Sequence, residues 1–486
     1  MNGMIKKFDQ FLIIFGASGN LAKELLYPSL YKLYQTNSLR KFNLNIILVS
    51  QGPFGLNTLL EAQKNKFPSP DDTNDVSLFF SQCTFLKVIY NDMNSFSVIF
   101  DHIKNASVTF EDAKLNFYLA LPDSLYKNVL DGLNMNMNLK SNSNVGLAIE
   151  KPFGTNSATS KELEEKLMSR VCENQIYRID HFLNKFSVKN LLTLKFYNTV
   201  FEPLLQKDHI QCILISQKEQ VGAEGRRAFD RMGIISDIMQ NHLLEILACL
   251  LMDLPKDDSV EAIKEEKIKI LQSLRLKSPD DVIVGQYKSY GEEYKDSKTA
   301  SFASFVLTSD GERFKDVPII MSAGKKLSEK KCEIRILFKE SQFSQLRRAS
   351  DKPFPVSQNE LVIRIQPNDA IYLKTNVNVG GYNPTPQIDQ VELDLNFNKR
   401  FKRNFKSEDK NDDRVDTDNV SDQYRYHLPH AYELCILNIL EFDRHSIVSS
   451  GEVEQCWRII DPINEIASCK PLVYYDDNIL KILQIL

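Results

Sequence analysis

Two short blocks of this sequence carry residue types that can move a proton and hold an anion. The first block, RIDHFLNK, contains Asp180, His181 and Lys185, and the second, MGIISDIMQNHLLEIL, contains Asp237 and His242 on one expected helix. Histidine suits a general base because its pKa lies near the working pH, and a carboxylate can orient its ring. With two cations suited to an anionic group, these residues predict the oxidation of a phosphorylated alcohol.

The bulk composition is that of a soluble globular protein with more than one domain. The chain has 486 residues, 43% hydrophobic and 26% charged, with a net charge of −4. This charge gives no global attraction to nucleic acid or to an anionic membrane. No apolar run approaches the roughly 18 residues of a membrane span, and the apolar N-terminal run enters a glycine turn too early for a signal peptide. We therefore expect neither nucleic acid nor membrane as a partner.

The eight cysteines lie scattered through the chain, without a CxxC motif and without histidines at metal-ligand spacing. This pattern favours free thiols in a reducing compartment. We therefore expect a cytoplasmic protein without a metal site.

The order of apolar runs predicts two domains of different class. Residues 10–180 alternate strand-like and helical patterns, as in a parallel α/β fold. This predicts a Rossmann-like dinucleotide-binding domain over residues 1–180. Strand-rich segments follow a helix-rich middle, so residues 181–486 predict an α+β domain with a large, mainly antiparallel sheet for substrate binding and dimerisation. Residues 402–427 are highly charged and predict a disordered insertion.

A glycine-rich loop follows the first expected strand and opens a helix, as a dinucleotide-binding turn does. Gly16 permits the tight turn, Gly19 lets a pyrophosphate approach the backbone, and Ala22 allows close packing of helix on strand. The exposed helix N-terminus favours phosphates, and Lys23 adds a cation. The predicted cofactor-binding residues of this part of the chain are Gly16, Ala17, Ser18, Gly19, Asn20, Leu21, Ala22, Lys23 and, after the second strand, Ser50.

The two blocks, with the motif EKPFG and the loop GASGNLAKELLYPSLYKLY, resemble the glucose-6-phosphate dehydrogenase family. The resemblance runs from about residue 11 to 400 and continues through HLPHAYELCIL and CWRIIDPIN. It implies oxidation of glucose 6-phosphate to 6-phosphogluconolactone with hydride transfer to NADP, the first step of the oxidative pentose phosphate pathway. It also implies a homodimer or homotetramer.

The resemblance assigns roles to individual residues. His242 is the general base, Asp180 orients its ring, and Lys151 of EKPFG binds the sugar beside the nicotinamide. Leu121 and Pro122, in FYLALPDSLY, line the nicotinamide end of the cofactor site. The substrate-binding residues that the resemblance implies are His181 and Lys185 for the phosphate, and Glu219, Asp237, Lys325, Lys330 and Gln366.

The sequence also departs from the family at several positions. Phe182 replaces a tyrosine, and losing one neutral hydrogen bond costs about 0.5–1.5 kcal/mol, which predicts a raised Michaelis constant. Asn20 replaces an aspartate, and Asn184 replaces a glycine. The loop after the second strand, LVSQGPFGLN, lacks the arginine of NADP-preferring members. NADP is the cofactor that the resemblance implies, and NAD stays possible.

A second, structural NADP is an open question. The positions that match parts of such a site are Lys331, Arg335, Arg364, Tyr372 and Lys374. Ser322 stands where the family often has arginine, and the C-terminal segment lacks the usual tryptophan.

Two alternative interpretations remain. A sugar dehydrogenase of the glucose–fructose oxidoreductase type also uses Glu-Lys-Pro after a dinucleotide domain, but would not require a phosphate site at His181 and Lys185. A non-catalytic nucleotide-binding regulator descended from the enzyme would explain the departures.

Overall fold

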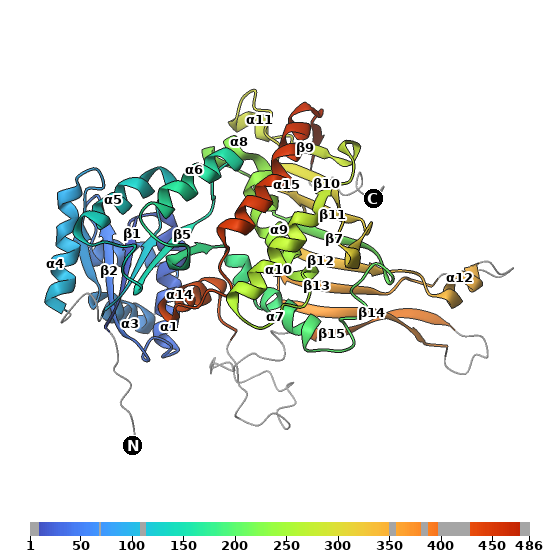
Figure 1. Ribbon diagram of the computed structural model, residues 1–486, viewed down its shortest axis with the longest axis horizontal. Helices are drawn as coiled ribbons and strands as arrows, with labels where there is room; N and C mark the ends of the chain where they lie inside the picture. The colour runs from blue at the N-terminus through green and yellow to red at the C-terminus, as the bar shows by residue number, and fades with distance from the viewer. Residues whose placement is uncertain are drawn as a thin grey trace, which may run out of the picture. The chain divides into compact units, whose positions relative to one another are not determined.

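The computed structural model describes residues 9–67, 70–106, 113–348, 356–380, 387–396 and 428–476 (Figure 1). The chain forms two compact units. Unit 1 comprises Met1–Asn184, Asp258–Lys264 and His430–Glu454, and unit 2 comprises Lys185–Asp257, Glu265–Pro429 and Gln455–Leu486. The predicted insertion at 402–427 lies outside the described residues.

Unit 1 is built on a six-stranded, wholly parallel sheet with the order β3-β2-β1-β4-β5-β6. The strands are β1 (Asp9–Phe15), β2 (Asn43–Ser50), β3 (Thr84–Lys87), β4 (Lys114–Leu119), β5 (Val145–Glu150) and β6 (Ile176–Ile179). The order reverses between β1 and β4, and ligands of such sheets bind at the carboxyl ends of the strands there. This confirms the predicted Rossmann-like domain.

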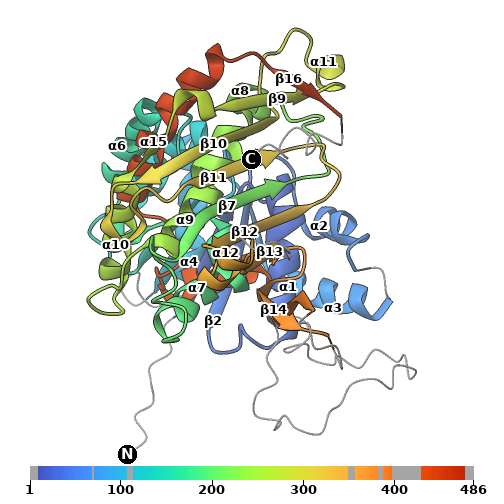
Figure 2. The ribbon, with the colours of Figure 1, turned by 90° about the vertical axis from the view of Figure 1, so that its right-hand side faces the viewer.

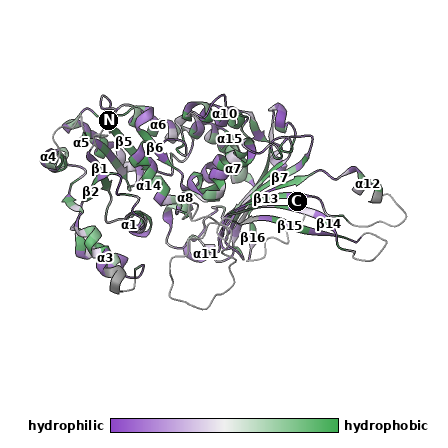
Figure 3. Cartoon of the chain, turned by 90° about the horizontal axis from the view of Figure 1, so that it is seen from below, coloured by the Kyte–Doolittle hydropathy of each residue, from purple (hydrophilic) through white to green (hydrophobic). Residues whose placement is uncertain are grey.

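Helices cover both faces of this sheet, which explains why its strands are hydrophobic on both sides (Figure 3). On β1, Leu12 and Ile14 belong to a core shared with helices α1 and α14, whereas Phe15 packs against Phe96 on the other face. The helices of this unit are η1 (Ala22–Leu26), α1 (Tyr27–Gln35), α2 (Leu56–Gln63), α3 (Pro70–Ser81), η2 (Met93–Phe96), α4 (Ser97–Ala106), η3 (Asp123–Leu125), α5 (Tyr126–Asn136), α6 (Ser157–Met168), η4 (Glu173–Gln175), η5 (His181–Asn184) and α14 (Ala431–Glu441).

Unit 2 is built on a large mixed sheet with the order β15-β14-β13-β12-β7-β11-β10-β9-β16, with β8 paired to β10 (Figure 2). Most pairs are antiparallel, as predicted, but β7 with β11 and β9 with β16 are parallel. Each parallel pair joins strands far apart in the chain, because a parallel pair needs a long crossover. The strands are β7 (Ile210–Lys218), β8 (Leu274–Leu276), β9 (Ile283–Tyr287), β10 (Phe302–Ser309), β11 (Ile319–Gly324), β12 (Lys331–Phe338), β13 (Glu360–Gln366), β14 (Ala370–Asn378), β15 (Ile388–Asn396) and β16 (Val473–Tyr475).

A long buried helical stretch packs against this sheet. The sequence predicts one long helix here, but the structure divides it into α8 (Arg227–Ile234), the π-helix η6 (Ile235–Leu243) and α9 (Leu244–Leu251). Gly233, with φ of 69°, forms the kink after which η6 begins. The stretch Arg227–Leu251 is long and apolar enough to cross a membrane, but 94% of its apolar window is buried within the protein. It is therefore a core helix of unit 2. The other helices here are α7 (Phe186–Phe196), α10 (Val260–Ser273), η7 (Pro279–Asp281), α11 (Tyr290–Glu293), η8 (Glu312–Phe314), α12 (Gln342–Arg348) and α15 (Ser450–Cys469).

Buried charges hold α9 in place. Glu245 forms an ion pair with Lys267 of α10 at 2.7 Å, with both side chains buried. The ammonium group of Lys195 donates to the carbonyl oxygens of Leu250 and Met252, at the end of α9. Burial lowers the pKa of Lys195 to about 7, and the two carbonyl oxygens accept hydrogen bonds from its buried amino group. The Glu245 ion pair fixes the start of α9, and Lys195 fixes its end.

The side chain of Arg178 on β6 is 0% exposed and holds the last strand of the parallel sheet. Its guanidinium donates two hydrogen bonds to Glu164 of α6, at 2.9 and 2.5 Å, and two to Glu173 of η4, both at 2.8 Å. A fifth, at 3.5 Å, reaches the carbonyl oxygen of Val448. These bonds complete all five donors of the guanidinium, which makes its burial tolerable.

The group formed by Arg178, Glu164 and Glu173, here called the Arg178 clamp, also lowers the pKa of Glu173. Burial raises the pKa of Glu173, but the hydrogen bonds and charge of Arg178 outweigh burial, so the pKa lies below the usual carboxyl value. This part of the stability is therefore present above about pH 4.3 and is lost as the pH falls through the lowered pKa.

Replacing Arg178 with methionine should lower the free energy of unfolding by about 1.5–3 kcal/mol, because Glu164 and Glu173, which are 17% and 31% exposed, would lose its charge and its hydrogen bonds. Urea denaturation followed by circular dichroism measures this loss. A triple variant that adds Glu164→Gln and Glu173→Gln should recover part of it. An unchanged urea midpoint in the single variant would contradict the role of the clamp.

Candidate active site

The glycine loop after β1 lies against the end of β4. Gly16 has φ of 77°, and a Cβ atom added to it would lie 2.2 Å from the carbonyl oxygen of Ala120 and 2.8 Å from the side chain of Leu121. Ala120 itself donates to the carbonyl oxygen of Phe15 at 3.1 Å. Only glycine fits between these two strand ends. The loop thus leaves a backbone cradle at the turning point of the sheet, which fits the pyrophosphate of a dinucleotide.

The helix that follows this loop begins as a π-helix, η1. The amide nitrogen of Gly19 donates to the carbonyl oxygen of Gly16 at 2.8 Å, and that of Lys23 donates to the carbonyl oxygen of Gly19 at 3.1 Å. The widened turn is supported from α2 and the loop after it, where Gln63 and Lys66 donate to the carbonyl oxygen of Lys23 at 2.8 and 3.1 Å. The other predicted residues of the loop lie in sequence between Gly16 and Lys23, whose backbone groups form these hydrogen bonds. They are Ala17, Ser18, Asn20, Leu21 and Ala22.

The end of β2 is polar but uncharged. Ser50 is buried, and its hydroxyl lies 3.2 Å from that of Ser18. The next residues, Gln51 and Gly52, are exposed. Lys66 reaches this part of unit 1, but its ammonium group is bound to Glu24 at 2.8 Å and to nearby carbonyl oxygens. The groups at the end of β2 that could bind a ribose are therefore hydroxyl and backbone groups.

The loops after β4 and β5 complete this edge of the parallel sheet. Leu121 and Pro122 follow β4 directly, and Lys151 follows Glu150, the last residue of β5. Because the carboxyl ends of parallel strands meet at one edge, Lys151 belongs to the same edge as the glycine loop. Within unit 1 the sequence-predicted cofactor residues and Lys151 are thus brought to one side of one sheet.

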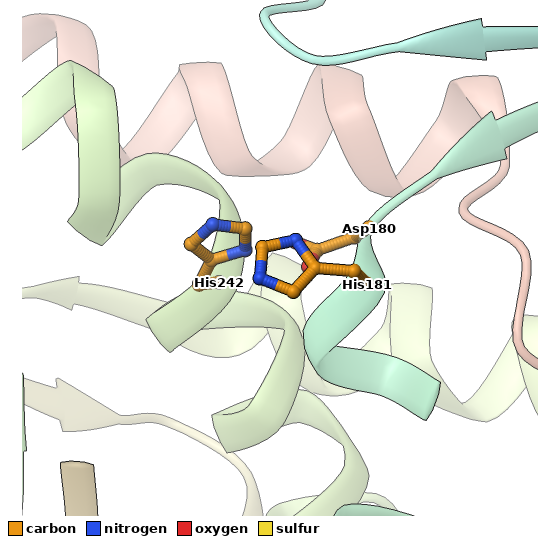
Figure 4. Close-up of side chains that lie close together, drawn as sticks. All are labelled: Asp180, His181 and His242. Atoms are coloured by element: carbon orange, nitrogen blue, oxygen red, sulfur yellow. The ribbon is translucent and has the colours of Figure 1, made fainter. Parts of the chain in front are cut away.

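Asp180 and His181 follow β6, at the same edge. The carboxylate of Asp180 accepts a hydrogen bond from the amide nitrogen of Phe182 at 3.0 Å, so Asp180 caps the short helix η5. The ring of His181 stacks on that of Tyr432 from α14, with centroids 5.4 Å apart and an angle of 24°. Figure 4 shows Asp180 and His181 where β6 leads into η5, and His242 on the helix η6.

Helix α14 supplies support that the sequence did not predict. Asn184, which replaces a glycine of the family, donates to the sulfur of Cys435 at 3.3 Å and accepts from Asn438 at 3.0 Å. The backbone of Asn184 is not left-handed, so its Cβ is accepted without strain. No local signal links α14 to η5, because about 250 residues separate them in the chain.

In unit 2, Asp237 and His242 lie five residues apart in the π-helix η6. Hydrogen bonds of such a helix join residues five apart, so these two side chains lie closer to one face than in an α-helix. Asn241 keeps this form. Its amide group donates to the carbonyl oxygens of Ser236 and Asp237, each at 3.1 Å, and its oxygen accepts from the amide nitrogen of His242 at 2.7 Å.

Lys325 joins the predicted acids of this unit. Its side chain is 1% exposed, and its ammonium nitrogen lies 2.6 Å from Glu219 and 3.4 Å from Asp237. The same nitrogen lies 4.8 Å from the ring centre of Phe229. The buried cation is compensated by two carboxylates, which are partly exposed, so the group keeps a net charge of −1. The cluster leaves carboxylate oxygens suited to sugar hydroxyl groups.

A second polar group of unit 2 surrounds Lys185. Burial lowers the pKa of Lys185, nearby Lys330 lowers it further, and Asp369 acts in the opposite direction. Asp369 is fixed by Ser187, whose amide and hydroxyl groups donate to it at 3.0 and 2.5 Å. Gln366, the last residue of β13, pairs with Cys332 near the start of β12. Asp369 was not predicted from the sequence, and no motif marks it.

The cations that match a structural NADP site are engaged by acids of the same sheet. Arg335 donates to both oxygens of Glu360, and Lys374 lies 3.1 Å from Glu360. Lys331 lies 2.8 Å from Glu333. The guanidinium of Arg364 lies 5.7 Å from the ring centre of Tyr372. An additional nucleotide would have to compete with Glu360 and Glu333 for these cations.

All eight cysteines are free, as predicted. Three of them, Cys332, Cys435 and Cys456, are buried beside polar groups of the two units. The arrangement as a whole offers a dinucleotide cradle in unit 1, a histidine with acids and a buried lysine in unit 2, and cations for an anionic group.

Family models and known proteins match nearly the whole chain. The model described as "Glucose-6-phosphate dehydrogenase, NAD binding domain" matches residues 13–190, and "Glucose-6-phosphate dehydrogenase, C-terminal domain" matches residues 192–478. Glucose-6-phosphate 1-dehydrogenase of Emericella nidulans is 33% identical over 486 residues, covering 97% of this chain and 87% of the relative. That of Caenorhabditis elegans is 34% identical over 475 residues, covering 93% and 85%.

Solved structures agree with these matches. A glucose-6-phosphate dehydrogenase in complex with its substrate glucose-6-phosphate has a TM-score of 0.83 and 32% identity, with 99% of each chain covered. Glucose-6-phosphate 1-dehydrogenase from Mycobacterium avium has a TM-score of 0.79 and 26% identity, covering 97% of this chain and 94% of that one.

Replacing Gly16 with alanine should abolish measurable dinucleotide binding, because the added Cβ meets Ala120 and the left-handed backbone disfavours alanine by about 1–2 kcal/mol. Isothermal titration calorimetry measures the affinity. Gly52→Ala is the matched control, because a Cβ there meets nothing within 4 Å. Equal affinities for both variants would show that the cradle does not form the cofactor site.

Proposed function

Because this chain belongs to the glucose-6-phosphate dehydrogenase family, we propose that it oxidises glucose 6-phosphate to 6-phosphogluconolactone, with NADP as the hydride acceptor. It is an oxidoreductase of carbohydrate metabolism at the first step of the oxidative pentose phosphate pathway. The observation that carries this proposal is the buried Lys325, which lies between Glu219 and Asp237. Asp237 belongs to η6, the helix that also carries His242. This cluster combines polar groups for a sugar with a nearby base.

Substrate recognition divides between charge and hydroxyl contacts. His181 and Lys185 bind the phosphate, with Lys330 as a further cation, because charge-assisted bonds to a phosphate are among the strongest in proteins. The sugar hydroxyl groups bind Glu219, Asp237 and Lys325. Gln366 contributes another contact from the end of β13.

The chemical step needs a base for the proton of the C1 hydroxyl group. His242 accepts this proton through its ring nitrogen, and Asp180 orients the ring and stabilises its charged form. Lys151 hydrogen-bonds the substrate at the edge of the parallel sheet. When bound, NADP supplies the nicotinamide that accepts the hydride from C1.

The glycine loop, Gly16–Lys23, would hold the pyrophosphate of the cofactor, and Leu121 and Pro122 would line its nicotinamide end. Ser18, Ser50, nearby backbone amides and Lys23 hold the 2′-phosphate in place of the missing arginine. Ser50 is uncharged and can hydrogen-bond a 2′-hydroxyl, and the missing arginine removes part of the attraction for a 2′-phosphate, so NAD serves as a weaker alternative.

The working protein is a cytoplasmic homodimer or homotetramer with one nucleotide per chain. A relative from Solanum tuberosum is named the cytoplasmic isoform, which supports this location. The engagement of Arg335 and Lys374 by Glu360 argues against a second, structural NADP.

The direct test of the proposal follows nicotinamide absorbance at 340 nm with glucose 6-phosphate, using NADP and NAD in parallel. Turnover with NADP supports it, and added turnover with NAD supports the neutral 2′ site. Folded protein that binds nucleotide but turns over neither would favour a non-catalytic regulator instead.

His242→Asn should lower kcat by at least about 10²-fold while leaving glucose 6-phosphate binding within a few-fold, because it removes the base but keeps a similar volume. His209→Asn is the matched control, since His209 is exposed in the same unit. Steady-state kinetics and a binding titration separate the two effects. Unchanged turnover would refute His242 as the base.

Phe182→Tyr should lower the Michaelis constant for glucose 6-phosphate by up to about tenfold, because it restores one hydrogen bond worth about 0.5–1.5 kcal/mol. The Michaelis constant for NADP should stay the same, which serves as the internal control. A value for glucose 6-phosphate that does not fall would mean that the hydroxyl group does not reach the phosphate.

A further inference from the structure

One carboxyl group of the EKPFG motif has no part in the proposed mechanism. Glu150 is the last residue of β5, where it pairs with Ile179, the residue before Asp180. The hydroxyl group of Tyr118, on the neighbouring strand β4, donates to its carboxylate at 2.5 Å. A carboxylate with so short a bond, placed between two strand ends of the site, is held in one orientation.

A second tyrosine connects this carboxyl group to the phosphate-binding side of unit 1. Tyr432 of α14 stacks on His181 and also interacts with both Glu150 and Asp180. Burial together with these carboxylates raises the pKa of Tyr432, so its hydroxyl group stays protonated and acts as a donor. Glu150 is therefore in electrostatic contact with Asp180 and linked through Tyr432 to His181.

The groups around Glu150 come from several elements, and most of them are neutral. Lys151 is the single cation among them and Asp180 the single other carboxylate. The titratable groups that act on Glu150, or on which it acts, are Tyr118 from β4, Tyr126 from α5, Lys151 after β5, Asp180 after β6, and Tyr432 and Cys435 from α14.

The balance of these groups places the ionisation of Glu150 in the working pH range. Burial, with a smaller contribution from the charge of Asp180, raises the pKa of Glu150 to about 7. The hydrogen bond from Tyr118 and the charge of Lys151 act in the opposite direction. Glu150 thus carries a proton at mildly acidic pH and a negative charge at mildly alkaline pH.

We propose that Glu150 is a positioning residue that, when ionised, places a second negative charge behind Asp180 and so strengthens the catalytic base. The inference rests on the proposed function, in which Asp180 orients His242. An added negative charge stabilises the charged form of the imidazole and raises its basicity. The protonated form of Glu150 withdraws this support, so turnover is fastest when both Glu150 and the base are deprotonated.

The test is the pH profile of kcat/KM for glucose 6-phosphate between about pH 5.5 and 9, with the full-length protein and saturating NADP. The wild-type profile should fall on its acid side with a slope greater than one around pH 7, because protonation of Glu150 and protonation of the base both slow the reaction there. Glu150→Gln should reduce this slope to one and lower the alkaline plateau about tenfold through kcat, with the Michaelis constant for NADP unchanged.

Tyr118→Phe provides a second, independent variant. It removes the hydrogen bond that stabilises the carboxylate, so the steep part of the acid limb should shift to higher pH and keep a slope greater than one. Tyr177→Phe is the matched control, because Tyr177 is a buried tyrosine of the next parallel strand, β6, and no hydrogen bond to its hydroxyl group is present among the described residues. Its profile should match the wild type.

The outcomes separate the two proposals. An active wild type whose profile superimposes on those of Glu150→Gln and Tyr118→Phe would overturn the role of Glu150 while leaving the proposed function intact. A wild type without turnover would refute the proposed function and this inference with it. If Glu150→Gln does not fold, as judged by thermal denaturation, the direction of the shift in Tyr118→Phe decides.

Discussion

Unit 1 depends on the burial of one charge, the guanidinium of Arg178. The five buried N–H groups of this guanidinium need hydrogen-bond acceptors. The acceptors are Glu164 of α6, Glu173 of η4 and the carbonyl oxygen of Val448. Satisfying these N–H groups fixes β6 against three separate parts of the chain. The residues that follow β6, Asp180 and His181, inherit this rigidity. A catalytic carboxylate is useful only where its position is held this firmly.

The polar residues of both units follow the same physical rule. Several charges of the proposed site are paired with partners that set their positions. Lys325 lies between Glu219 and Asp237, Asp369 is fixed by Ser187, and Glu150 is bound by Tyr118. The π-helix η6 belongs to this pattern, because Asn241 satisfies the carbonyl groups that its wider turn would otherwise leave open. Polar groups fixed by hydrogen bonds and ion pairs are thus found at the proposed functional residues.

The sequence predicted both folds and the family because these depend on local patterns. Apolar runs marked several strands of each sheet, and the position of Gly16 after the first strand predicted a tight turn, where the structure shows that only glycine fits. The π-form of η6 was not predictable, because it depends on side-chain bonds of Asn241 that an α-helical pattern does not reveal. The roles of Tyr432 and Asn438 were also hidden, because α14 meets η5 only through the tertiary fold. The raised pKa of Glu150 arises in the same way.

The proposed site oxidises a sugar at C1 and recognises that sugar through its phosphate. The most direct measurement compares kcat/KM for glucose 6-phosphate and for glucose with NADP. Two charge-assisted contacts worth about 1.5–3 kcal/mol each predict a preference of roughly 10²- to 10⁴-fold for the phosphorylated sugar. Equal kcat/KM values, or a higher value for free glucose, would contradict phosphate recognition by this site. They would favour a sugar dehydrogenase that does not bind the phosphate.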